Sequence, residues 1–187
     1  MRLAPVLLLV ITCFQTTFGQ TQMSSGGVLD PLQADMDIRH YDIRLRVNTT
    51  EKTLDGYTEV SIVLAKPADT ILLQLIDAYK ISQVTLNNQP VTFQHNNHRI
   101  LIWGKQPIPS GKQVVKVLYA GNPPIAIRPP WQGGFTFTKD SGGNPWMSIN
   151  SQFEGGKIYF PCKDHPSDEP NEGVDFYITV SQGEVVA

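Results

Sequence analysis

Apolar and polar side chains alternate without interruption in Tyr41-Asp42-Ile43-Arg44-Leu45-Arg46-Val47. A period of two puts every apolar side chain on one face of an extended chain, which is typical of a strand with one buried face. The residues 48–52 read as a turn, and a second alternating segment follows with Thr58, Val60, Ile62 and Leu64. These residues predict two successive strands at the start of the fold.

Further short segments along the chain have the composition of strands. They are residues 71–75, 81–86, 91–93, 99–103, 113–119, 133–138, 147–149 and 175–180. Turn sequences separate most of them at intervals of about eight to twelve residues, and no long stretch has the 3.6-residue period of an amphipathic helix. The sequence therefore predicts an all-β domain, either an antiparallel β-sandwich or a curved, saddle-like sheet.

The first nineteen residues have the features of a signal peptide. Arg2 precedes an apolar run over residues 3–11, and Thr17 and Gly19 are small residues suited to cleavage before Gln20. The run is shorter than the roughly 20 apolar residues that cross a bilayer, so no membrane span is expected. The pattern predicts a secreted or periplasmic protein.

This processing would divide the chain into a signal peptide (1–19), a leader (20–37) and a β-domain (38–187). The leader is predicted to be flexible because it is polar, contains glycine and serine, and lacks periodicity. Lipidation of Cys13 is an alternative use of the first segment. Loss of Cys13 with the signal peptide leaves Cys162 as the single cysteine, which excludes an intramolecular disulfide.

The composition is that of a folded domain without a nucleic-acid partner. Hydrophobic residues make up 41% of the chain and charged residues 17%, which is ordinary for a globular protein. The formal net charge is -2, and lysine and arginine are scattered singly instead of forming a basic cluster. A nucleic-acid-binding surface is therefore not expected.

The sequence lacks the patterns of a catalytic or metal-binding site. A zinc peptidase site needs two histidines four residues apart on a helix, with a glutamate beside the first. The four histidines are His40, His95, His98 and His165, and none is followed by glutamate. His95 and His98 are expected to be solvated residues of a hairpin. No catalytic residue, metal ligand or cofactor is predicted in this chain.

Gln152 and Glu154 are the candidate binding residues. In an extended segment, residues two apart point to the same side, so both side chains would project into one space. A desolvated carboxylate is a suitable partner for an ammonium group, and a neighbouring amide can orient a ligand side chain. The alternative is that both are polar residues on a solvated strand face.

Two motifs near the end of the chain resemble a known family. The segment Ser151-Gln152-Phe153-Glu154 is followed, four residues later, by Tyr159-Phe160-Pro161-Cys162-Lys163-Asp164-His165-Pro166. Together they resemble the amino-terminal domain of the aminopeptidase N family of zinc metallopeptidases (gluzincins), in particular its secreted bacterial branch. The similarity runs from about Ile38 to Val180, with His165 standing where the family usually has glutamate.

This resemblance implies a substrate-anchoring role. Glu154 would bind the free α-amine of a peptide, and Gln152 would line the pocket for its first side chain. Cys162 would be a buried hydrophobic residue and Asp164 a cap for backbone N–H groups. The zinc site would lie in a catalytic domain beyond Ala187, so the expected partners are a peptide amino terminus and that domain, and this chain alone would be inactive.

The tryptophans support a second interpretation. Trp131 and Trp146 lie in loop-like sequence, where exposed aromatic rings can form a binding platform, whereas Trp103 is expected to pack in the core. The chain would then be a secreted β-sandwich module that binds carbohydrate or protein without catalysis.

Overall fold

A computed structural model of the chain describes residues 25–186, whose regular secondary structure is almost entirely β. The strands are β1 (Met36–Asn48), β2 (Thr53–Leu64), β3 (Ile71–Gln74), β4 (Tyr79–Leu86), β5 (Gln89–Pro90), β6 (Thr92–Asn96), β7 (Arg99–Trp103), β8 (Gly111–Gly121), β9 (Gly134–Lys139), β10 (Pro145–Asn150) and β11 (Val174–Thr179). Two short 3-10 turns, η1 (Pro31–Gln33) and η2 (Gly156–Ile158), complete the described elements. The predicted all-β class is confirmed. Within residues 25–186, no helix is long and apolar enough to cross a membrane.

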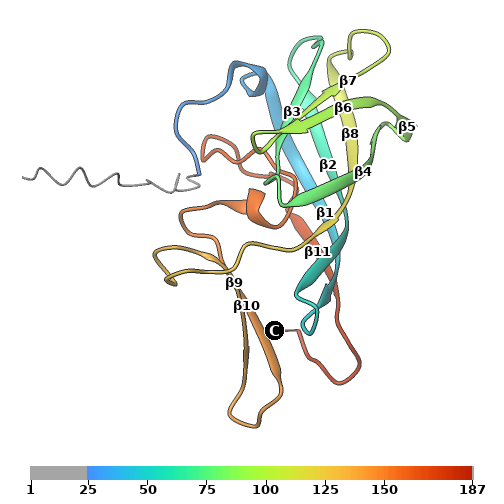
Figure 1. Cartoon of the computed structure of the whole chain (residues 1–187). Coiled ribbons are helices and arrows are strands. Elements are labelled where there is room, and N and C mark those ends of the chain that lie inside the picture. The colour runs from blue at the N-terminus through green and yellow to red at the C-terminus, as the bar shows by residue number, and fades with distance from the viewer. Residues whose placement is uncertain (1–24, 187) are drawn as a thin grey trace, which may run out of the picture.

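The strands form three sheets (Figure 1). The largest has the order β11-β1-β2-β8-β4-β5, and all its pairs are antiparallel except that β11 runs parallel to β1. A second sheet has the order β3-β7-β6, and the third is the β9–β10 hairpin, which projects from the body of the domain in Figure 1. Residues 122–133 connect β8 to this hairpin.

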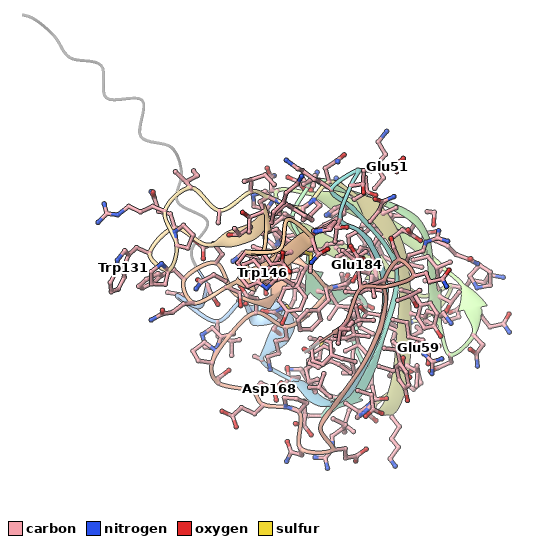
Figure 2. All side chains as sticks on the ribbon, turned by 90° about the horizontal axis from the view of Figure 1, so that it is seen from below. Glu51, Glu59, Trp131, Trp146, Asp168 and Glu184 are labelled. Atoms are coloured by element: carbon pink, nitrogen blue, oxygen red, sulfur yellow. The ribbon has the colours of Figure 1, made fainter. Side chains whose placement is uncertain are left out.

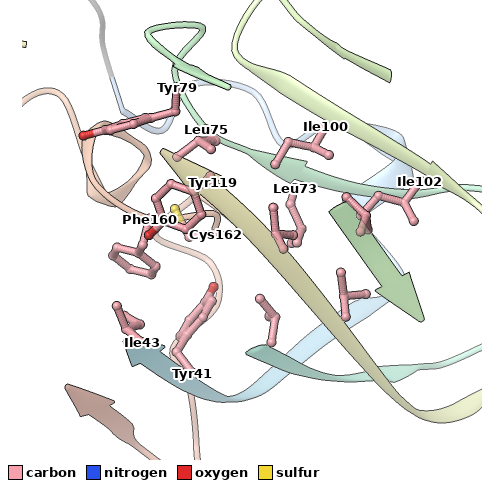
Figure 3. Close-up of a cluster of buried hydrophobic side chains, with 14 of the residues drawn as sticks. Tyr41, Ile43, Leu73, Leu75, Tyr79, Ile100, Ile102, Tyr119, Phe160 and Cys162 are labelled. Atoms are coloured by element: carbon pink, nitrogen blue, oxygen red, sulfur yellow. The ribbon is translucent and has the colours of Figure 1, made fainter. Parts of the chain in front are cut away.

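The hydrophobic core lies between the six-stranded and the three-stranded sheet (Figure 3). The alternation in β1 places Ile43 and Leu45 in this core, whereas Arg44 and Arg46 are exposed. Leu73 of β3 and Ile100 of β7 contribute to the same core from the other sheet. Strands β1, β2 and β8 therefore stabilise the fold by burying alternate side chains, as the sequence pattern predicts.

Three buried tyrosines connect the core to residues 159–166, the second of the two family motifs, which we call the Pro-Cys motif. The Tyr79 hydroxyl donates to the Ile158 carbonyl oxygen at 2.8 Å, and the Tyr119 hydroxyl donates to the Tyr159 carbonyl oxygen at 2.9 Å. The Tyr41 hydroxyl accepts a hydrogen bond from the backbone N–H of Lys163 at 3.1 Å. These three hydrogen bonds fix the backbone of residues 158–163 to the six-stranded sheet.

We expect these tyrosines to make the fold sensitive to alkali. Burial is the largest cause that raises the pKa of the Tyr41, Tyr79 and Tyr119 hydroxyls well above the ordinary value. In the unfolded chain they ionise near pH 10, so their contribution to stability is present below about pH 10 and is lost as the pH rises further. In an alkaline titration, their phenolate absorbance near 295 nm should appear only together with loss of the circular dichroism of the native fold. Reversible ionisation of all tyrosines near pH 10 with the native signal intact would contradict this.

The end of the leader makes defined contacts with the β-domain. Gln33 is buried, and its side-chain amide donates to the Leu72 carbonyl oxygen at 3.3 Å. Asp30 caps η1 and accepts a hydrogen bond from Arg99 at 2.7 Å. Residues 30–33 therefore contact the three-stranded sheet, and Met36 and Asp37 already belong to β1. The predicted signal peptide lies outside the described residues.

Candidate functional site

The segment with Gln152 and Glu154 is a turn, not the extended strand that the sequence predicts. The backbone N–H of Gly155 donates to the Ser151 carbonyl oxygen at 2.9 Å and closes this turn. Gln152 is exposed, whereas Glu154 is only 4% exposed. The expectation that both side chains project into one space was therefore wrong, because the two-residue period holds only for extended backbone.

Glu154 has one satisfied and one unsatisfied carboxylate oxygen. The backbone N–H of Gly133 donates to Oε1 at 2.7 Å. Within residues 25–186, Oε2 is buried and has no hydrogen-bond partner. Buried carboxylate oxygens are normally paired, since an unpaired one loses its hydration without compensation. The arrangement therefore favours a ligand that donates hydrogen bonds to Oε2.

Gln152 and Phe153 line an open groove of about 710 Å³. Other parts of its wall come from the segment Asp164 to Pro166 and from Ser25 and Gly26. Glu154 does not contribute to this wall in the described part of the chain. The turn thus presents the amide to the groove and the carboxylate to Gly133.

The Pro-Cys motif is fastened to strand β3. Gln74 and Cys162 exchange two backbone hydrogen bonds of 2.7 and 3.0 Å, and the Gln74 side-chain oxygen accepts from the Asp164 N–H at 2.9 Å. Cys162 is 4% exposed, and burial raises the pKa of its thiol well above the ordinary value. The sulfur lies beside the rings of Tyr119 and Phe160 (Figure 3). The predicted structural role of Cys162 as a buried apolar residue is confirmed.

The Asp164 carboxylate contacts three other residues of the site. Its Oδ1 accepts from the Gly156 N–H at 3.2 Å, which confirms the predicted capping role, and from the Ser25 hydroxyl at 2.9 Å. Its Oδ2 accepts from the Lys157 ammonium at 2.7 Å, and both side chains are less than a tenth exposed. Sequence reasoning missed this buried ion pair, because the partners are seven positions apart and no regular spacing marks them.

A second buried ion pair lies next to the first in the chain. The Lys163 ammonium donates to Asp168 at 2.7 Å and to the Met36 carbonyl oxygen at 2.6 Å. Asp168 in turn accepts from the backbone N–H of Ile38 at 3.1 Å. This second pair holds the motif segment against the start of β1.

The histidines have structural contacts. His165 contacts the Gly27 carbonyl oxygen through Nε2 at 3.1 Å and accepts the Ser167 N–H at Nδ1. His95 contacts the Leu75 carbonyl oxygen at 2.9 Å and its side chain is 10% exposed, so its predicted solvation was wrong. His98 is 42% exposed, as expected of a hairpin residue. Among the described residues, no group of His, Cys, Asp and Glu is arranged to hold a metal ion.

Trp131 and Trp146 are both about half exposed, and Trp131 lies at the outer edge of the molecule in Figure 2. The Trp131 ring lies 6.5 Å from the Phe153 ring, measured between centroids, so it partly covers the turn that carries Glu154. Trp103, predicted to lie in the core, is half-buried at the end of β7.

Comparison with solved structures identifies proteins with a similar fold. No family model and no curated protein matches the sequence. A mutant M1 zinc metallopeptidase from Deinococcus radiodurans, bound to a Tyr-Ser-Ala substrate, is similar over 79% of this chain, with 25% identity and a TM-score of 0.56. Native leukotriene A4 hydrolase from Saccharomyces cerevisiae is similar over 89% of this chain, with 14% identity and a TM-score of 0.60. At this identity, the similarity shows the fold alone.

The chain spans about a third of the Deinococcus protein and about a quarter of the yeast protein, at 33% and 26% of their lengths. The matched part is the amino-terminal domain of M1 zinc metallopeptidases. The fold of the described residues is therefore that of a metallopeptidase-related amino-terminal domain.

Proposed function

We propose that this chain is the amino-terminal, substrate-anchoring domain of a secreted zinc aminopeptidase. In this proposal Glu154 binds the free α-amine of a peptide, and Gln152 lines the space for the first side chain. Zinc and the catalytic groups belong to a separate catalytic domain that acts with this one. The chain alone holds a peptide but does not hydrolyse it.

The unpaired Oε2 of Glu154 is the observation that carries the proposal. A peptide α-ammonium offers three N–H donors and a positive charge, and it compensates a buried carboxylate better than a neutral donor does. The likeness to a metallopeptidase bound to a tripeptide supports the same class of ligand.

The position of Gln152 fits a ligand that contacts both residues. Gln152 faces the open groove, and only Phe153 separates it from Glu154 in the chain. A peptide whose amine binds Glu154 can direct its first side chain towards the groove and the Gln152 amide. Since Oε2 is out of contact with solvent, binding requires the Trp131 side chain to move away from the turn, while Gly133 keeps its hydrogen bond to Oε1.

An exposed apolar surface supports the presence of a second domain. Large apolar side chains around the β9–β10 hairpin and the loop before it are between 39% and 70% exposed: Ile125, Ile127, Trp131, Trp146, Ile149 and Phe153. Exposed apolar patches of this kind typically mark interaction sites. In the proposed enzyme they contact the catalytic domain, which brings zinc to the peptide held at Glu154.

Replacement of Glu154 tests the proposal. The native chain should bind Tyr-Ser-Ala but not its N-acetylated form, because acetylation removes the charged amine. Glu154→Gln should weaken binding roughly tenfold or more, since a charge-assisted pair is replaced by a neutral contact. Isothermal titration, with ¹H–¹⁵N spectra to confirm folding, measures both. Glu51→Gln, at an exposed turn residue visible in Figure 2, is the matched control and should bind as the native chain does.

Two results would contradict this function. Equal binding of the free and the acetylated peptide would remove the role of the amine, and zinc-dependent hydrolysis by the purified chain would remove the need for a separate catalytic domain. Oligosaccharides test the alternative of a carbohydrate-binding module, which the exposed Trp131 and Trp146 favour. Their addition should leave the tryptophan fluorescence unchanged if the chain is a peptide anchor.

A further inference from the structure

Gly133 occupies a position that has no room for a side chain. A Cβ built there would lie 2.5 Å from Glu154 Oε2 and 2.2 Å from the Asn150 carbonyl oxygen. Both distances are far below a normal carbon–oxygen contact. Its backbone is not in the left-handed region, so the need for glycine comes from space alone.

The same residue contacts both oxygens of the Glu154 carboxylate. Its N–H donates to Oε1 at 2.7 Å, and its bare Cα allows Oε2 to approach closely. The hydrogen bond and the close contact, both with Gly133 directly before β9, therefore prevent the carboxylate from rotating. Because the Asn150 oxygen belongs to the backbone of β10, a methyl group at residue 133 could be accommodated only by separating this backbone unit from Glu154.

We infer that Gly133 is the positioning residue of the amine-binding site: it orients the Glu154 carboxylate so that Oε2 is available to the ligand. This inference rests on the function proposed above. A carboxylate that is free to rotate loses part of its affinity, because binding must then also fix its orientation. Gly133 itself does not contact the peptide in this arrangement.

A double-mutant cycle tests whether Gly133 acts through Glu154. Binding of Tyr-Ser-Ala to the full chain is measured for the native protein, Gly133→Ala, Glu154→Gln and the double variant. We expect Gly133→Ala to weaken binding at least about fivefold in the native background and to have no further effect when Glu154 is glutamine. Gly142→Ala is the matched control, since its Cβ would meet only the flexible side chains of Asn144 and Asp140.

A second readout needs no substitution at residue 133. The amide proton of Gly133 should shift upfield in Glu154→Gln, because the carboxylate that accepts its hydrogen bond has been lost. An unchanged Gly133 resonance overturns the inference even if Gly133→Ala does not fold.

The outcomes separate the inference from the proposed function. Suppose that Glu154→Gln weakens binding, but Gly133→Ala weakens it by the same factor whether residue 154 is glutamate or glutamine. Gly133 then does not position Glu154, and only the inference fails. If Tyr-Ser-Ala does not bind, or binds equally well to Glu154→Gln, the proposed function fails and the positioning role fails with it.

Discussion

Asp164→Ala is expected to lower the free energy of unfolding by about 3–5 kcal/mol, the usual cost of removing one partner from a buried ion pair. The Lys157 ammonium lies 2.7 Å from this carboxylate, and both side chains are less than a tenth exposed. The substitution also removes the acceptor for the Gly156 N–H and the Ser25 hydroxyl. Urea denaturation followed by circular dichroism measures the change.

A surface pair provides the comparison for this prediction. Arg46 and Asp55 form a 2.9 Å ion pair whose side chains are 70% and 42% exposed. Asp55→Ala should therefore change stability by no more than about 1 kcal/mol. If the two variants were equally stable, the Lys157–Asp164 pair would have no special part in holding the motif segment.

Gly155→Ala should destabilise the fold by several kcal/mol. Gly155 has φ 79° and ψ −179°, a conformation nearly restricted to glycine, which costs other residues about 1–3 kcal/mol. A Cβ there would also lie only 2.0 Å from Asp164 Oδ1, so the methyl group must displace the buried carboxylate. The two effects act in the same direction, and thermal unfolding of the variant measures their sum.

Gly143→Ala separates these two effects. Gly143 has a similar φ of 84°, but a Cβ there would meet nothing within 4 Å. This variant should show the backbone strain alone and be clearly more stable than Gly155→Ala. Equal losses in the two variants would mean that the contact with Asp164 adds nothing.

The long strands β1, β2 and β8 could be predicted from the sequence because each buries alternate side chains. In β1, Ile43 and Leu45 point inward and Arg44 points outward, as the alternation requires. The order of the strands could not be predicted, since pairing partners lie far apart in the chain and a local period carries no information about them. The pairing of β2 with β8 and the parallel pairing of β1 with β11 are examples.

The site was predicted less well than the fold. Gln152 and Glu154 were interpreted as strand residues, although Gly155 and Gly156 follow directly and favour a turn. That signal was available in the sequence. The close approach of Gly133 to Glu154 could not be predicted from the sequence. It depends on how the loop before β9 folds back onto a turn that comes later in the chain.

The parallel pairing of β1 with β11 has a consequence for how the chain reaches its native state. The first strand of the sheet shares an edge with the last described strand, so this edge stays open during synthesis until nearly all of the domain has emerged. Contacts between such distant segments slow folding, because a large loop must close before they form. Until then β1 exposes unpaired backbone groups that can pair with another chain. Aggregation through β1 is therefore the expected failure of a slowly emerging chain, and a chaperone that covers residues 36–48 should suppress it.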